Sequence, residues 1–335
     1  RALSGTPQAM DKKKAAFYLA QGPYNQALGL WYAGEKFSPE AKADVEAKVA
    51  TMIDVYKSRL QTADWLAPET REKAITKLNV ITPHIGYPEK LPETYDKKII
   101  DENLSLVENA QKLVEISIAH SWSKWNKPVD RSEWHMPAHM VNAYYDPQQN
   151  QIVFPAAILQ APFYDIAQSS SANYGGIGAV IAHEISHAFD TNGASFDENG
   201  SLKNWWTEED YAAFKERTDK IVDQFEGLDS YGAKVNGKLT VSENVADLGG
   251  VACALEAAKR DKDFSVREFF VNFATIWRMK AREEYMQMLA SVDVHAPAKW
   301  RTNVIVSNFD EFHKEFDVKE GDGMWRAPED RVIIW

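Results

Sequence analysis

The sequence predicts a mainly α-helical protein with a small β-sheet, an α+β fold. Helical periodicity fills most of the first hundred positions, one short aromatic and β-branched stretch is typical of a hairpin, and helical patterns joined by polar loops make up most of the remainder. The chain has 335 residues, of which 44% are hydrophobic. It is therefore long enough to bury a substantial core, as one large domain or two smaller ones.

Helices dominate the expected N-terminal part. Ser38 and Pro39 form a helix start, and the apolar residues that follow recur at spacings of three and four. Two further helices are expected over 68–80 and about 102–122. The proline-rich segment HIGYPEKLPETYD is expected to form a crossing between them.

A β-hairpin is expected over 141–154. VNAYY and QIVFP are short, aromatic and β-branched, and the polar DPQQN between them is typical of a turn. The apolar run NYGGIGAVIAHEISHAFDT follows, with Asn173 as a candidate helix cap.

Charge and composition exclude several classes of protein. The formal net charge is -11, and no basic run is present that could neutralise phosphates, so nucleic acid is not an expected partner. No stretch reaches the roughly 18 to 20 apolar residues of a transmembrane span. Cys253 is the only cysteine, so neither an internal disulfide nor a thiolate metal cluster is possible, and we expect a buried structural role for it.

The segment VIAHEISHAFD carries two histidines four residues apart around a glutamate. On a helix His183 and His187 share a face, so both imidazoles can point at one ion, with Glu184 beside them near a metal-bound water. Catalytic zinc takes three protein ligands and keeps one position open. A third ligand is therefore expected from elsewhere in the chain.

The segment VSENVAD supplies that ligand. One helix could present Glu243 to the metal and Asp247, four residues later, to the second ring nitrogen of a ligand histidine. Alone, an H-E-x-x-H pattern can arise by chance, and ENVAD would be a solvated helix face. Together the two segments favour a site for one Zn2+ per chain.

The remaining histidines are expected to be structural. Pro137 separates His135 from His139, and no acidic residue accompanies that pair, which argues against a helical metal face. His84, His120 and His313 have no neighbouring ligand pattern.

In the order NAYY, HEISHAFD, ENVADLGG and HAPAKWR, these motifs resemble the neprilysin family of zinc metallopeptidases, including the bacterial endopeptidase O type. The resemblance implies a thermolysin-like zincin catalytic domain over 104–335 and part of a helical capping lobe over 1–103. It also implies an endopeptidase that cuts oligopeptides on the amino side of hydrophobic residues.

The resemblance further implies a role for each matching residue. His183, His187 and Glu243 would bind zinc, Glu184 would be the general base, and Asp247 would be the carboxylate behind a ligand. His295 would stabilise the transition state, Arg301 would hold a substrate carbonyl, and Asn142 and Ala143 would pair with the substrate backbone. The apolar pocket for the residue after the cut would be formed by Ile158, Phe163, Val180 and Trp277, and Thr302 at its rim leaves the fine preference open.

Departures from the family pattern carry expectations too. Animal members have a cysteine three residues before the terminal Trp335, and this chain has Val332 there, which points to a bacterial member. For such a member, the cell envelope, the periplasm or secretion is slightly favoured over the cytoplasm. Family members have a further block upstream, so that segment is an expected partner alongside oligopeptides. The alternatives are a zinc-retaining peptide-binding or scaffolding protein that is inactive without that segment, and a structural zinc site, which would need a fourth ligand.

Overall fold

The computed structural model describes residues 5–335. Its N-terminal part is helical, as expected. The side chain of Ser38 accepts a hydrogen bond from the Ala41 amide at 3.1 Å and caps the second helix, which confirms the predicted start. The helices here are α1 (Lys12–Lys36), α2 (Pro39–Thr62), α3 (Pro68–Asn79), η1 (Glu93–Lys97) and α4 (Leu106–Ser123).

The sheet has three strands in the order β1-β3-β2. The predicted hairpin is present, because β2 (Tyr144–Asp146) runs antiparallel to β3 (Gln151–Pro155). The sequence did not predict β1 (Thr82–Gly86), a strand parallel to β3, in which the proline-rich segment begins. That pairing joins parts of the chain far apart in sequence, so the local residue pattern could not reveal it. β2 remains at one edge of the sheet.

The rest of the fold is mostly helical, which confirms the α+β prediction. Asn173 ends a helix rather than capping its start, because Ser169 is the N-cap residue and the Asn173 side chain instead holds the backbone at Asp165. The elements are α5 (Ser170–Asn173), the π-helical turn η2 (Tyr174–Gly178), α6 (Ala179–Ser186), η3 (Gly193–Ser195), α7 (Glu208–Phe225), β4 (Asp229–Ser230), β5 (Ala233–Lys234), α8 (Gly237–Ala258), α9 (Val266–Ile276), α10 (Glu283–Val292), α11 (Ala298–Val306), α12 (Asp310–Glu315) and η4 (Pro328–Asp330).

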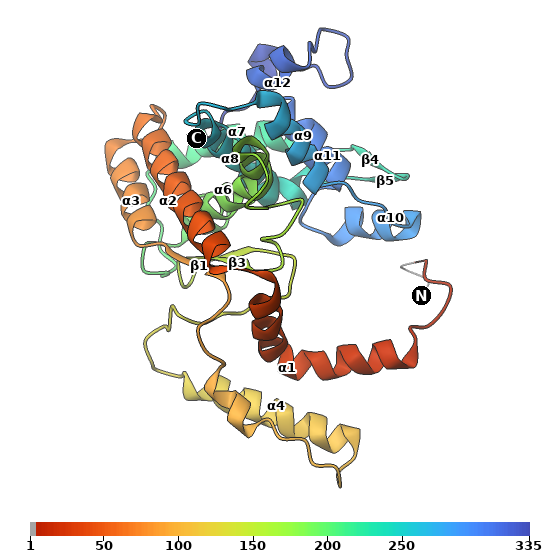
Figure 1. Cartoon of the computed structure of the whole chain (residues 1–335). Helices are drawn as coiled ribbons and strands as arrows, with labels where there is room; N and C mark the ends of the chain where they lie inside the picture. The colour runs from red at the N-terminus through yellow and green to blue at the C-terminus, as the bar shows by residue number, and fades with distance from the viewer. Residues whose placement is uncertain (1–4) are drawn as a thin grey trace.

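One hydrophobic core joins α2, α6 and α8 near the centre of the molecule (Figure 1). Tyr56 of α2 is fully buried, and its hydroxyl bonds to Ser186 of α6. Trp335 stacks against Trp65 and Phe214 in the same core. Contacts therefore run across the predicted boundary at 103, and the division into 1–103 and 104–335 stays a prediction.

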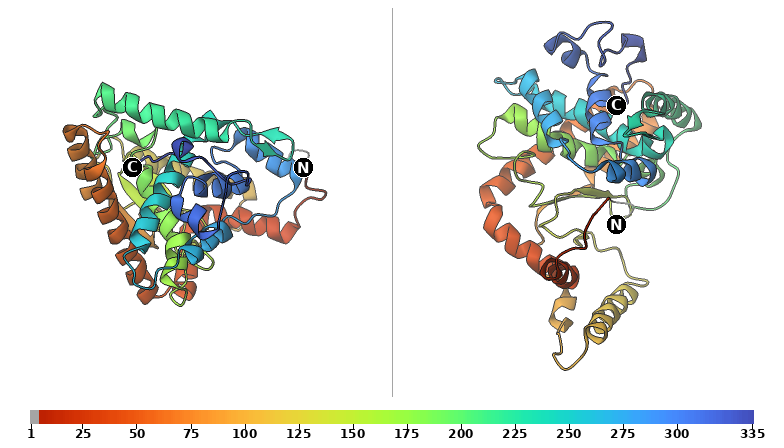
Figure 2. Two further views of the ribbon diagram at one scale, coloured as in Figure 1. Left: turned by 90° about the horizontal axis from the view of Figure 1, so that it is seen from above. Right: turned by 90° about the vertical axis from the view of Figure 1, so that its right-hand side faces the viewer.

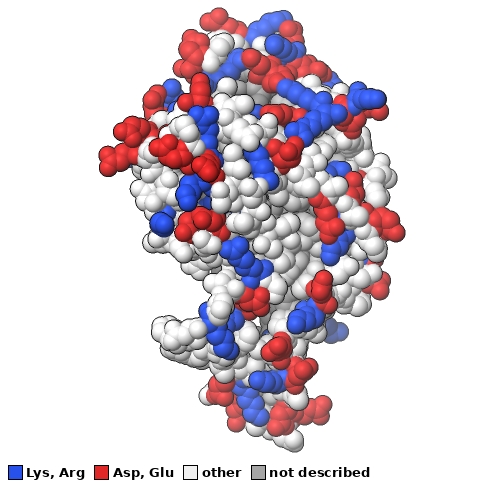
Figure 3. Space-filling model, turned by 90° about the vertical axis from the view of Figure 1, so that its left-hand side faces the viewer, with Lys and Arg blue, Asp and Glu red and all other residues white. Residues whose placement is uncertain are grey.

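Helix α4 and the N-terminal half of α1 extend away from this core in the lower part of Figure 1, with α4 at the bottom of the right-hand view in Figure 2, whereas Ala33 near the end of α1 is part of the core. Several of their large apolar side chains are exposed, among them Phe17, Trp31, Val107, Ile118 and Trp122. On the face drawn in Figure 3, acidic and basic side chains are interspersed, without a basic stripe. Among residues 5–335 there is no helix that combines the length and apolar character needed to cross a bilayer.

Candidate active site

Close packing of α6 against α8 brings the two predicted metal-binding segments together. Gly250 of α8 makes this possible, because a Cβ at this position would lie 2.7 Å from the His183 amide nitrogen and 3.0 Å from the Ala179 carbonyl oxygen. Gly249 is similarly crowded by the side chains of Trp335 and Tyr56. Gly250 thus lets the backbones of α6 and α8 approach each other, and Gly249 leaves room for the aromatic side chains packed on α8.

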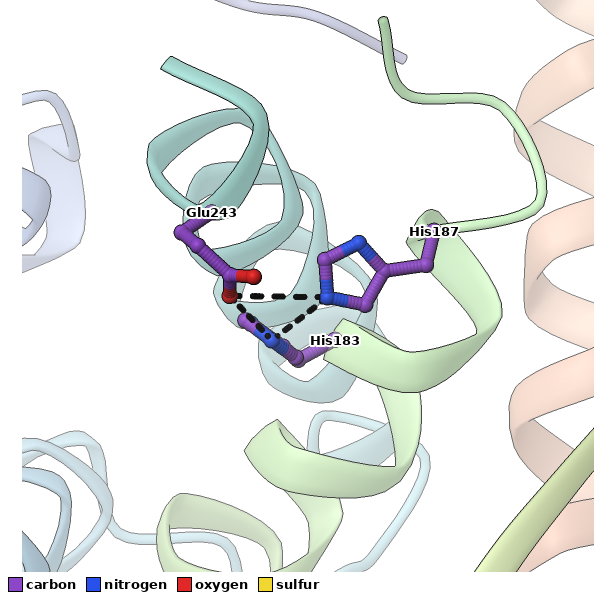
Figure 4. Close-up of side chains that lie close together, drawn as sticks. All are labelled: His183, His187 and Glu243. Atoms are coloured by element: carbon purple, nitrogen blue, oxygen red, sulfur yellow. Dashed lines mark hydrogen bonds and ion pairs between the residues drawn. The ribbon is translucent and has the colours of Figure 1, made fainter. Parts of the chain in front are cut away.

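Three side-chain atoms converge between these helices, as Figure 4 shows. His183 Nε2 lies 3.0 Å from His187 Nε2 and 3.2 Å from Glu243 Oε2, and His187 Nε2 lies 3.5 Å from the same oxygen. Ligands of tetrahedral zinc at roughly 2.0 to 2.1 Å from the metal are separated from one another by about 3.3 Å. The three distances therefore fit zinc.

The electrostatics of this group also favour a cation. Glu243 Oε2 is buried, and although three imidazole nitrogens lie within 3.5 Å of it, none has the geometry of a hydrogen bond to it. Although burial opposes ionisation, the surrounding imidazoles hold the pKa of Glu243 well below its usual range. Burial likewise opposes a charge on His187, but Asp190 and Glu243 raise the pKa of that imidazole well above its usual value. The carboxylates thus favour positive charge at this position, which a divalent ion supplies.

A carboxylate stands behind each of the two histidines. Asp247 Oδ1 lies 2.8 Å from His183 Nδ1, and Asp190 Oδ2 lies 2.6 Å from His187 Nδ1. Such partners fix the tautomer and the ring orientation of a metal-binding histidine. Burial favours the protonated form of Asp247, yet Arg301 and His183 lower its pKa to about 2, so this carboxylate stays ionised.

Glu184 and His295 reach the site from different elements. Glu184, on α6, is only 5% exposed, and burial raises the pKa of its carboxyl group above the usual value. His295 follows α10, and its Nε2 lies 3.2 Å from Glu243 Oε2. Asp293 accepts hydrogen bonds from both the backbone amide and Nδ1 of His295, at 2.9 and 2.8 Å, which aims Nε2 at the site.

Arg301 is buried between an acid and an aromatic ring. Its Nε and Nη2 each donate to Asp247 at 2.7 Å, and its guanidinium lies 3.9 Å from the centre of the Trp277 ring. Because the ion pair uses Nε and Nη2, Nη1 remains outside it. The ion pair therefore couples Arg301 to the carboxylate behind His183.

A single cavity of about 470 Å3 is lined by all of the site residues predicted from the sequence. Its apolar side includes Ile158, Phe163, Val180 and Trp277, and Asn142 and Ala143 border it just before the edge strand β2. Thr302 is not among the lining residues, and its hydroxyl donates to Ala298 O at 3.2 Å.

The sequence reasoning missed Asp190 and Asp293. Both stand close to a predicted site residue, three positions after His187 and two before His295, so the proximity of an acid was the available signal. Within residues 5–335, His183, His187 and Glu243 form the one group of three or more potential metal ligands. The remaining five histidines each contact a polar group elsewhere in the protein. His84 and His313 contact the backbone carbonyls of Arg131 and Ser307, and His120, His135 and His139 contact the side chains of Glu133, Gln149 and Gln21, respectively.

Comparison with known proteins identifies the family. Residues 142–332 match peptidase family M13, and residues 1–88 match a second pattern of the same family. The chain belongs to this family, the neprilysin-type zinc metallopeptidases, which confirms the resemblance read from the motifs.

Three similar proteins support this assignment. The putative zinc metalloproteinase in the scaA 5' region of Streptococcus gordonii is 80% identical over 269 residues, which cover 80% of this chain and 48% of that protein. A neutral endopeptidase of Lactococcus lactis is 53% identical over 335 residues, covering 100% of this chain and 53% of its own length. The crystal structure of PEPO from Lactobacillus rhamnosis matches with a TM-score of 0.95 and 42% identity, covering 100% of this chain and 53% of that one. The chain thus spans about half the length of the curated relatives it matches.

Proposed function

We propose that this chain is the zinc-binding catalytic part of an endopeptidase that hydrolyses oligopeptides on the amino side of hydrophobic residues. The observation that carries the proposal is the meeting of the zinc-binding group, Glu184, His295, Arg301 and an apolar pocket in one cavity. Membership of family M13 supports it, as does the similarity to a putative zinc metalloproteinase and to a neutral endopeptidase.

The chemistry assigned to the chain's own residues is proton transfer and charge stabilisation. Bound zinc supplies a Lewis acid and lowers the pKa of water in the site. Glu184 takes the proton from the attacking water and delivers it to the departing amine. His295 Nε2, held by Asp293, donates to the oxyanion that develops on the scissile carbonyl. These interactions are strongest in the transition state, where they raise the rate.

Substrate binding is assigned to the edge of the sheet and to the apolar side of the cavity. A peptide laid against β2 gains main-chain hydrogen bonds that tolerate many sequences, and Asn142 and Ala143 flank that edge. Arg301 Nη1 donates to a peptide carbonyl. The side chain after the cut enters the pocket that Phe163 and Trp277 border, where apolar side chains are favoured.

The experiment for this proposal is cleavage of a quenched fluorescent oligopeptide with a central Phe or Leu. We expect cutting before that residue, loss of cutting on chelation, and recovery on return of zinc. A matched peptide with Asp in place of the Phe is expected to be cut far more slowly. Zinc-independent cutting, or equal cutting of both peptides, would contradict the proposal.

We further propose that the upstream segment present in the longer relatives packs on the exposed apolar side chains of α1 and α4. Relatives are about twice as long as this chain, and Trp31 and Trp122 are 65% and 69% exposed. Hydroxyl-radical footprinting checks this: both rings should react in the 335-residue chain and be protected when the upstream segment is present. Equal reactivity in the two forms would rule the contact out.

A further inference from the structure

Lys77 is a buried cation close to the zinc-binding helix that the proposed chemistry does not use. It lies on α3 and is 1% exposed. Its Nζ donates to three backbone carbonyls, Ala188 O at 2.8 Å, Gly193 O at 2.8 Å and Phe196 O at 2.7 Å. All three carbonyls belong to the turn over 188–196 that follows the H-E-x-x-H helix, hereafter the 188–196 turn.

The same turn holds the carboxylate behind His187. Asp190 Oδ1 accepts from the amides of Asn192 and Gly193 at 2.7 Å, while Oδ2 lies 2.6 Å from His187 Nδ1 and accepts from Ser242 at 2.5 Å. A Cβ at Gly193 would lie 1.8 Å from His187 O, so the turn folds directly against the ligand residue. The carbonyls of the turn thus converge on Lys77, and two of its amides converge on Asp190.

Stability alone does not account for a lysine at this position. Burial lowers the pKa of Lys77 to about 7, although Asp190, Asp197 and Glu198 oppose that shift. Burying the ammonium therefore carries a desolvation cost that an apolar side chain of similar length would not have. Gly193 O also accepts from the Phe196 amide, and Phe196 O also accepts from Trp205 Nε1, so two of the three carbonyls keep a donor without the lysine.

We propose that Lys77 is a positioning residue for the zinc site: its ammonium fixes the 188–196 turn, so that the Asp190 carboxylate holds the His187 ring in its metal-binding orientation. This inference rests on the proposed function only in taking His187 as a zinc ligand. It gives a helix of the N-terminal part an influence on the metal that passes through the 188–196 turn. Lys77 and the 188–196 turn that it contacts are far apart in sequence.

The test measures zinc directly. Lys77→Met, which keeps the length of the side chain and removes its donors, is expected to weaken zinc binding by about 10 to 100 times, the loss of affinity typical when the groups that orient a ligand are removed. Zinc should pass to a chelator correspondingly faster than from the parent protein. The cobalt-substituted variant is expected to show a shifted d–d absorption spectrum. Lys77→Gln, which keeps two donors, should be intermediate, and it carries the test if the Met variant does not fold.

A second measurement asks whether Lys77 acts through Asp190. If it does, the double variant Lys77→Met with Asp190→Asn should release zinc at about the rate of the worse single variant, because both changes disable one pathway. Multiplicative effects would overturn the proposal.

The matched control is Asn308→Leu, which removes another buried side chain that donates to backbone carbonyls, those of Val304 and Ile305. None of these three residues lines the cavity of the zinc site. This variant should lower thermal stability without changing zinc release. Equal acceleration by this control, or parent-like zinc release and cobalt spectra in both Lys77 variants, would overturn the proposal. Since no measurement uses peptide cleavage, a failure of the proposed peptidase activity would be seen separately.

Discussion

Replacing Glu184 by Gln is expected to abolish peptide cleavage while zinc stays bound. Glu184 lines the cavity next to His183, but it is not one of the three residues whose ligand atoms converge on the metal position. Glutamine keeps the size and one carbonyl oxygen of the side chain but cannot take up a proton. Loss of general acid and base catalysis costs about 10² to 10⁴ in rate, so kcat should fall by at least that range.

The measurement for this variant combines kcat with zinc stoichiometry and peptide affinity. Zinc content near one per chain and unchanged peptide binding would show that only proton transfer was lost. The opposite result, cleavage by the Gln variant at the parent rate, would remove Glu184 from the mechanism. If the parent protein also binds zinc and peptide but cuts nothing, the peptide-binding alternative would take its place.

The sequence was most informative where the chemistry depends on local spacing. His183 and His187 share a helix face through a four-residue interval, and Glu243 and Asp247 do so on a second helix, so both pairs could be recognised without a structure. The relation between the pairs is tertiary. It depends on the close approach of α6 and α8 at Gly250, which the letters DLGG do not specify.

Long-range contacts account for what the sequence could not reveal. Thr82–Gly86 becomes a strand because β3 is available beside it, not because its own residues alternate. Lys77 stands in REKAITKLN, where a lysine suggests a solvated helix face, and its three acceptors lie more than a hundred positions further on. Asp190 was closer to a recognised motif, yet its role requires the geometry of the turn to be known.

Replacing Gly250 by Ala is expected to damage both the fold and the metal site. The added Cβ would lie 2.7 Å from His183 N and 2.9 Å from His183 Cα, and these backbone atoms cannot rotate away. α6 and α8 must therefore separate, which moves Glu243 away from His183. Overpacking of this kind costs about 1 to 3 kcal/mol of unfolding free energy. We expect zinc affinity to fall by on the order of tenfold or more as the ligands lose their spacing.

Thermal unfolding of the metal-free protein and zinc titration separate the two effects. Gly34→Ala is the matched control, because Gly34 lies in α1 and a Cβ there has no atom within 4 Å. Alanine is favoured over glycine inside a helix by roughly 0.5 to 1 kcal/mol, so this control should be neutral or slightly stabilising and leave zinc affinity unchanged. Parent-like zinc affinity in Gly250→Ala would mean that the two helices tolerate a wider separation than the ligand distances of 3.2 and 3.5 Å indicate. If the free energy of zinc binding falls by more than the unfolding free energy of the metal-free protein, Gly250 acts mainly by setting the distances between the zinc ligands.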